Sequence, residues 1–96
     1  QFTEYPKGGF YDWHMDADTN CHTEPPVRKI SMTLLLSDPQ EFTGGDLEFM
    51  SAGNKPPQLL QGQAIFFCSL IRHRIAKVKK GIRRSLVMWF GGPPFR

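Results

Sequence analysis

Turn-forming residues cut this chain of 96 residues into many short apolar segments. Glycine, proline and their usual polar companions gather at residues 7–9, 24–26, 37–39, 43–45, 56–57, 61–63 and 80–81. Strands of a few residues joined by such turns are typical of all-β barrels and sandwiches, whereas helices need longer uninterrupted segments. The spacing of the turns therefore predicts an all-β protein.

The apolar segments between these turns predict eight strands. We expect them at residues 1–5, 10–15, 29–36, 46–50, 58–60, 64–68, 73–78 and 84–90. Eight short strands in two sheets make a jelly roll. Residues 65–67 and 86–90 are continuous apolar runs, which indicate central strands covered on both faces. Phe66, Phe67 and Phe90 are therefore expected in the core, and Trp13 and Trp89 are candidates for the wall of a substrate cleft.

Size and composition limit the remaining possibilities. The chain is long enough for one domain, residues 1–96, with a thin core. It starts at Gln1 rather than Met, so we expect a fragment of a longer protein. Cys21 and Cys68 are too few for a disulfide framework and are expected to be free thiols in a reducing, cytoplasmic compartment. No apolar run approaches membrane-spanning length, so no membrane association is expected.

A basic cluster raises the question of a nucleic-acid partner. The net charge is only +3, and the cluster comprises Lys77, Lys79, Lys80, Arg83 and Arg84. Lysines on an edge strand also prevent it from pairing with other chains. We favour this second interpretation, with Arg83 set apart for the reasons below, and expect no nucleic-acid partner.

The segment His14-Met15-Asp16 points to metal chemistry. In an extended strand the side chains at i and i+2 share a face, so His14 and Asp16 can bind one ion while Met15 points away. Two histidines and one carboxylate leave part of an iron(II) coordination sphere open. His73, after an apolar strand, is the candidate for the second histidine. Asp18 is an alternative carboxylate on composition.

Segments spread along nearly the whole chain carry a resemblance to a known family. They are YPKGGFYDWHMD (5–16), RKISMTLLLS (28–37), GGDLEF (44–49), GQAIFF (62–67) and the stretch from HRI (73–75) through Val78 to GIRRSL (81–86). As a set they resemble the iron(II)- and 2-oxoglutarate-dependent dioxygenases, in the prolyl 4-hydroxylase-like group with its PKHD-type hydroxylases. Two positions depart from the family pattern, since Cys68 and Lys77 stand where proline is usual. Neither replaces a candidate ligand.

The resemblance implies a fold and a set of roles. The fold is a double-stranded β-helix, from which the family's N-terminal buttressing helices are absent here. His14, Asp16 and His73 would bind Fe(II), and Arg83 would pair with the far carboxylate of 2-oxoglutarate through its guanidinium fork. Tyr5 and Ser85 are further candidates for contact with that co-substrate.

The implied reaction consumes O2 and hydroxylates an unactivated C–H bond, with succinate and CO2 as co-products and ascorbate as a possible reductant. A peptidyl prolyl residue is the favoured substrate. A free amino acid or other small molecule, and a non-catalytic jelly-roll binding module, stay open as alternatives. A nucleic-acid oxygenase is disfavoured, because Arg83-Arg84-Ser85 does not reproduce the arginine signature of such relatives.

Residues 17–27 are expected to form a lid at the barrel mouth, with His22 on its surface. The oligomeric state is left open.

Overall fold

The computed structural model describes residues 1–17, 27–50 and 55–92, and this part of the chain is almost entirely strand. The elements are β1 (Phe2–Tyr5), β2 (Tyr11–His14), β3 (Val27–Leu35), a short 3₁₀ helix η1 (Pro39–Glu41), β4 (Phe42–Gly44), β5 (Leu47–Phe49), β6 (Ala64–Cys68), β7 (His73–Ile75), β8 (Val78–Gly81) and β9 (Arg83–Gly92). Among the described residues no helix has the length and apolar character needed to cross a membrane.

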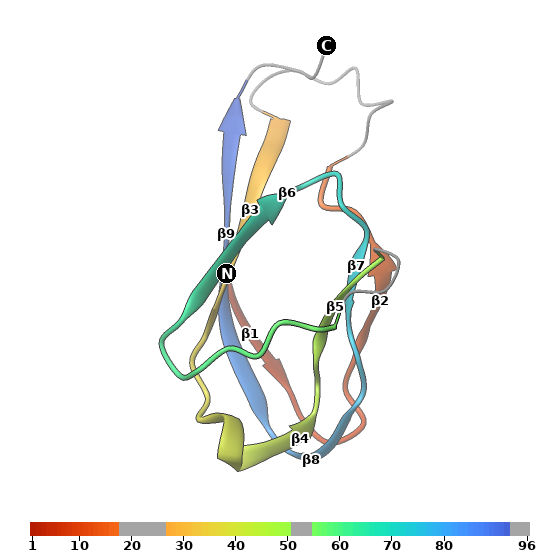
Figure 1. Cartoon of the computed structure of the whole chain (residues 1–96), viewed down its shortest axis with the longest axis vertical. Helices are drawn as coiled ribbons and strands as arrows, with labels where there is room; N and C mark the ends of the chain where they lie inside the picture. The colour runs from red at the N-terminus through yellow and green to blue at the C-terminus, as the bar shows by residue number, and fades with distance from the viewer. Residues whose placement is uncertain (18–26, 51–54, 93–96) are drawn as a thin grey trace.

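The strands form two facing sheets and a small third one (Figure 1). A four-stranded sheet has the order β1-β9-β3-β6, a three-stranded sheet the order β2-β7-β5, and β4 pairs with β8. All pairings are antiparallel. In Figure 1 the two larger sheets stand on opposite sides of the molecule, and β4 and β8 lie at its lower end. The prediction of an all-β jelly roll is confirmed.

The core between the sheets is small. The buried apolar side chains among the described residues are Met32, Leu35, Leu47, Ile75 and Val78. Several polar side chains are equally buried on the inner face of the four-stranded sheet, among them Ser31, Thr33, Arg83 and Ser85. Packing alone does not require a polar inner face of this kind, and Thr33, Arg83 and Ser85 line a cavity between the sheets.

Phe66 and Phe90 do not belong to the core, contrary to the expectation from the apolar runs. Phe66 is 59% exposed and Phe90 is 45% exposed, and their rings lie 6.2 Å apart. Side chains alternate between the two faces of a strand, so the runs supply both faces of the sheet. Phe67 points inward and is partly buried, while its neighbour Phe66 lies on the outer face, which no described residue covers.

Several expected elements also differ from the structure. Residues 58–60 form no strand, and the backbone N–H and carbonyl oxygen of Leu60 bond to Gln63 in the following turn instead of to a neighbouring strand. The expected strand 73–78 is two strands, because β7 pairs with β2 and β5 whereas β8 turns away to pair with β4. The expected break at residues 43–45 overlaps β4, and η1 was not expected.

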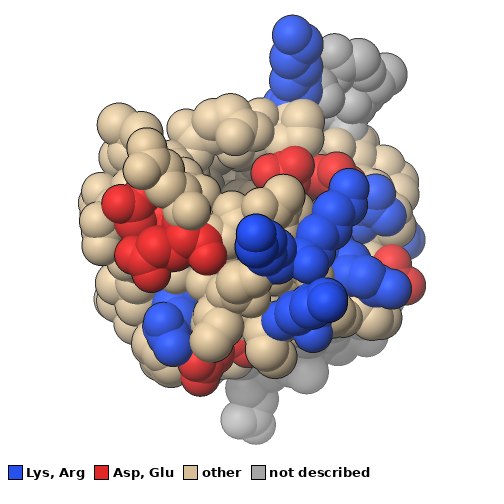
Figure 2. Space-filling model, turned by 90° about the horizontal axis from the view of Figure 1, so that it is seen from below, with Lys and Arg blue, Asp and Glu red and all other residues tan. Residues whose placement is uncertain are grey.

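The lysines of the basic cluster lie on β8 and just before it, where Lys77, Lys79 and Lys80 are exposed, and its two arginines lie on β9. Figure 2 views the molecule from this end, and it shows lysine and arginine side chains gathered on one side with acidic side chains beside them. β8 belongs to a two-stranded sheet, so one side of this strand has no neighbouring strand among the described residues, and the lysines lie on an edge strand. This placement agrees with the edge-strand interpretation.

Gly81 occupies a position where a side chain cannot fit. Its φ is +78°, and a Cβ atom would lie 2.0 Å from the backbone oxygen of Glu41. Gly62 has a similar φ of +82° but open space around it. We predict that Gly62→Ala lowers the free energy of unfolding by about 1 kcal/mol through backbone strain alone, whereas Gly81→Ala lowers it by about 3 kcal/mol or more. Urea unfolding of the two variants measures both values, and equal losses would contradict the clash.

Candidate metal centre

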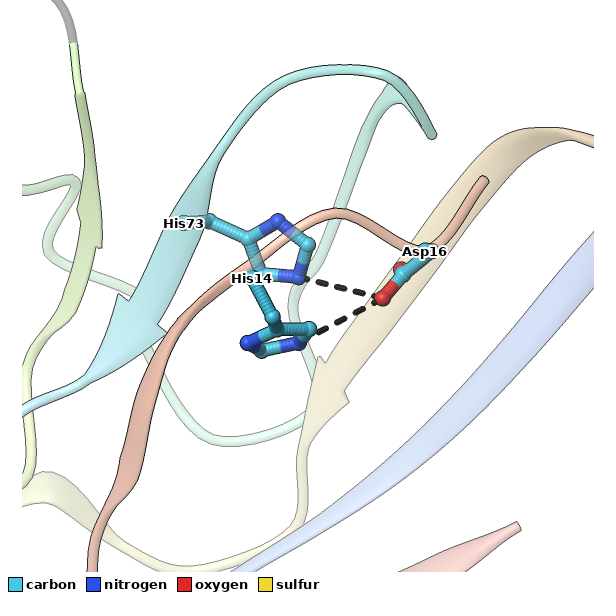
Figure 3. Close-up of side chains that lie close together, drawn as sticks. All are labelled: His14, Asp16 and His73. Carbon is cyan, nitrogen blue, oxygen red and sulfur yellow. Dashed lines mark ion pairs between the residues drawn. The ribbon is translucent and has the colours of Figure 1, made fainter. Parts of the chain in front are cut away.

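Three predicted residues come together between the two sheets (Figure 3). His14 is the last residue of β2 and His73 is the first of β7, and the two are direct partners in the antiparallel register. Asp16 follows β2 by two residues, and its Oδ1 lies 3.4 Å from Nε2 of each histidine. One ligand atom from each residue lies within 4.8 Å of the others. One ion can therefore reach all three.

Asp16 owes its position to a loop contact rather than to strand geometry. The expected strand 10–15 ends at His14, so Asp16 is not part of a ladder. Its backbone N–H and that of Ala17 both donate to the carbonyl oxygen of Ser69, at 2.9 and 3.1 Å. The connection between β6 and β7 thereby fixes where the carboxylate stands relative to His73.

The hydrogen bonds of both histidines leave their Nε2 atoms facing the centre. Nδ1 of His14 lies 2.7 Å from the carbonyl oxygen of Asp12, and Nδ1 of His73 lies 2.8 Å from that of Ile71. A carbonyl oxygen only accepts, so each Nδ1 carries the proton and each neutral ring has its lone pair on Nε2. Two lone pairs and a carboxylate oxygen then converge on one point. A bound divalent cation satisfies all three, so the donor set fits Fe(II).

Burial and mutual contacts shift the pKa values of the pair Asp16 and His73. Burial alone would raise the pKa of Asp16, but in the metal-free protein hydrogen bonds from protonated His73, from Ser31 and from Trp89, together with the charge of His73, outweigh it. The pKa of the carboxyl group therefore lies well below its usual range. For His73, burial lowers the pKa. The contact with Asp16 and the hydrogen bond to Ile71 raise it by more, so the pKa lies above its usual value.

The other predicted site residues line the same cavity of about 210 Å³ as the three candidate ligands. These are Tyr5, Arg83 and Ser85. Tyr5 and Arg83 are cross-strand partners on β1 and β9, which puts their side chains on one face. Arg83 is only 3% exposed. Burial lowers its pKa, and the neighbouring Tyr5 and Asp46 act in the opposite direction.

Ser85 holds Arg83 in place. The Oγ of Ser85 accepts a hydrogen bond from Nη1 of Arg83 at 3.2 Å, and it lies 2.5 Å from the Oγ1 of Thr3. Burial raises the pKa of Tyr5, and the charge of Arg83 partly opposes that rise. No acidic side chain forms an ion pair with Arg83 within the described ranges, in contrast to Arg84, which pairs with Glu4 at 3.1 Å. Arg83 is therefore a buried cation available to an anionic ligand.

Sequence reasoning missed three polar residues of the site: Thr3, Ser31 and Ser69. Ser31 interrupts an apolar strand, and its hydroxyl donates to Asp16 Oδ2 at 2.5 Å. The alternation of polar and apolar residues along β3 was a usable signal for it, because polar residues on one face of a buried strand need partners. Trp89 lines the cavity as expected, whereas Trp13 does not and packs against Arg74 instead. Most of the proposed lid, residues 18–26 with Asp18, Cys21 and His22, lies outside the described residues, and Val27 belongs to β3 rather than to a loop.

Fold and side-chain cluster together define a class, that of jelly-roll proteins with two histidines and a carboxylate between their sheets. Residues 1–91 match the model of the 2OG-Fe(II) oxygenase superfamily. The chain therefore belongs to that superfamily, and the resemblance seen in its sequence is confirmed.

Relatives with assigned names agree with this membership. A PKHD-type hydroxylase of Synechococcus sp. strain CC9311 is 37% identical over 84 residues, which are 86% of this chain and 37% of the relative. A PKHD-type hydroxylase of Parvibaculum lavamentivorans is 33% identical over 93 residues, which are 93% of this chain and 41% of the relative. The chain thus spans about two fifths of the length of these relatives.

Solved structures share the fold. A prolyl-4-hydroxylase of Pseudomonas putida superposes with a TM-score of 0.73 at 27% identity, over 95% of this chain and 50% of that one. A viral collagen prolyl hydroxylase from Paramecium bursaria Chlorella virus-1, solved with 2OG, gives a TM-score of 0.75 at 24% identity, over 96% of this chain and 60% of that one. The second similarity, at its lower identity, supports the fold alone.

The raised pKa of His73 predicts how pH affects the metal-free protein. A group with a folded-state pKa above its unfolded value stabilises the fold fully below the unfolded value of about 6.5. That contribution is lost as the pH rises through the folded-state pKa. In the presence of a chelator, we therefore expect the free energy of unfolding to fall over this range, and to fall less in His73→Gln. Urea unfolding at a series of pH values measures both slopes, and equal slopes would contradict the assignment.

Proposed function

We propose that this chain is the catalytic core of an Fe(II)- and 2-oxoglutarate-dependent dioxygenase that hydroxylates a prolyl residue of a peptide. One observation carries the proposal: the convergence of His14, Asp16 and His73 in the same cavity as the buried Arg83. Metal ligands alone would fit many proteins. A permanent cation inside the same cavity adds a place for a dicarboxylic co-substrate.

The roles of the residues follow from their chemistry. His14, Asp16 and His73 would hold Fe(II), and a set of three protein ligands would leave room on the ion for co-substrate and O2. With 2-oxoglutarate and O2, bound iron supplies the oxidising power for C–H hydroxylation, and succinate and CO2 leave as co-products. Arg83 binds the far carboxylate of 2-oxoglutarate, and Ser85 and Thr3 keep its guanidinium group in one orientation. Tyr5 contributes a hydroxyl group beside Arg83.

The names of relatives and the aromatic lining of the cavity support the prolyl substrate. The similar proteins of known name include a prolyl-4-hydroxylase and PKHD-type hydroxylases. The cavity is lined by Tyr11 and Trp89, two aromatic side chains suited to packing against a pyrrolidine ring. Ascorbate is proposed as the reductant that returns iron to its ferrous state. A free amino acid is the alternative substrate, and the assay below separates the two.

The setting of this core is also a proposal. Residues 1–96 form one domain of a longer protein, as the greater length of the matched relatives supports. Cys68 is a free thiol, which agrees with a reducing compartment such as the cytoplasm.

A turnover assay tests the proposed reaction. We expect the purified chain, supplied with Fe(II), 2-oxoglutarate and a proline-rich peptide, to release succinate and form hydroxyproline in equal amounts. Mass spectrometry detects a peptide 16 Da heavier, and free proline in place of the peptide tests the alternative. Succinate at the level of a folded His73→Ala control would contradict the proposal.

Arg83 predicts a selective effect on the co-substrate. Replacing it with Gln removes a buried charge-assisted interaction, and we expect the KM for 2-oxoglutarate to rise about 10- to 100-fold. Arg84→Gln is the matched control, because Arg84 is its exposed neighbour and pairs with Glu4 on the outside. Steady-state kinetics at saturating peptide measure both. Equal KM values for the two variants would remove Arg83 from its role.

A further inference from the structure

Only one of the two carboxylate oxygens of Asp16 faces the histidines. Oδ1 lies 3.4 Å from both Nε2 atoms. Oδ2 accepts two hydrogen bonds on its other side, from Ser31 Oγ at 2.5 Å and from Trp89 Nε1 at 3.1 Å. Figure 3 shows the carboxylate presenting a single oxygen to the two imidazole rings. The two oxygens therefore have different partners before any metal binds.

Both donors are themselves held in place. Ser31 is completely buried, and its Oγ lies 2.9 Å from the Oγ of Ser69, which is also completely buried. The carbonyl oxygen of Ser69 accepts the backbone N–H of Asp16, so the same residue fixes the backbone and the side chain of this carboxylate. On the opposite side, the guanidinium carbon of Arg28 lies 3.8 Å from the centre of the Trp89 ring. A stacked arginine limits the tilt of the indole and so the direction of its N–H.

We propose that Ser31 and Trp89 are positioning residues that keep Asp16 a one-oxygen ligand of the metal. This inference rests on the proposed function, since it assumes that the three ligands bind Fe(II). The two lone pairs of Oδ2 both accept hydrogen bonds, so binding the ion through both oxygens would require Oδ2 to release at least one of its donors. The indole N–H can only donate, so a release of Trp89 would leave a partly buried donor without a partner, which is costly.

The consequence is the number of open positions on the ion. A carboxylate bound through both oxygens takes a second position in the coordination sphere. Two positions are needed for 2-oxoglutarate and a third for O2, so a one-oxygen aspartate keeps the sphere open enough for the proposed reaction. Partners of this kind behind a ligand typically change metal affinity 10- to 100-fold when they are removed.

Two variants test the proposal, each with a matched control elsewhere in the chain. Trp89→Phe keeps an aromatic ring and removes the N–H, and Trp13→Phe makes the same change at a tryptophan that packs against Arg74. Ser31→Ala removes one buried hydroxyl. Ser37→Ala does the same at a buried serine whose hydroxyl bonds only to the backbone of Ile82 and Arg84. Thermal unfolding of the metal-free proteins identifies folded samples before any titration.

The measurement is a titration with Co(II), without co-substrate or peptide, followed by its visible d–d absorption. We expect Kd to rise about 10- to 100-fold in Trp89→Phe and in Ser31→Ala, with a changed band intensity that reports an altered coordination number. Trp13→Phe and Ser37→Ala should keep both the Kd and the spectrum of the wild type. Wild-type binding that persists unchanged in the two folded test variants would overturn the inference alone. No Co(II) binding by the folded wild type would overturn it together with the proposed metal site.

Discussion

The antiparallel pairing of β2 with β7 is the interaction on which the site depends, because it sets His14 directly opposite His73. Side chains alternate along a strand, so a register slip of one residue would send one histidine to the other face. The pairing alone is not sufficient, since Asp16 lies beyond the end of β2. The hydrogen bond from its backbone N–H to the carbonyl oxygen of Ser69 fixes the position of Asp16 next to the two histidines and completes the set of three ligands.

The two large sheets make different contributions. The three-stranded sheet provides the histidines, and the four-stranded sheet provides the buried cation Arg83 and the hydroxyl and indole groups that contact Asp16. Placing Ser31, Ser85 and Arg83 on the inner face reduces the apolar area available for the core, which consists of a few side chains such as Leu47 and Val78. Buried polar groups are tolerated here because they bond to one another, and none of the described residues leaves a buried polar side-chain atom without a partner.

Turn chemistry predicted the fold class. Strand alternation named His14 and Asp16 as neighbours, but β2 ends at His14 and the backbone bond to Ser69 places Asp16 instead. Local patterns named His73 as a candidate but could not predict that it lies beside His14, because proximity across a sheet depends on register between distant strands. The role of Arg83 came from the resemblance to a family. The apolar runs misled the assignment of Phe66 and Phe90, since hydrophobicity does not tell an inner face from an outer one. The split between β7 and β8 was missed for a related reason, because both halves have strand-like composition and only their partners differ.

Anaerobic addition of Fe(II) and 2-oxoglutarate tests the central claim, that three ligands and a buried arginine form one site. Chelation of ferrous iron by the keto acid produces a visible charge-transfer band, so the band requires metal, co-substrate and geometry together. We predict a band that saturates at one equivalent of each and does not require a peptide substrate. A folded chain that gives no band, at iron and 2-oxoglutarate concentrations well above those of the protein, would contradict the account.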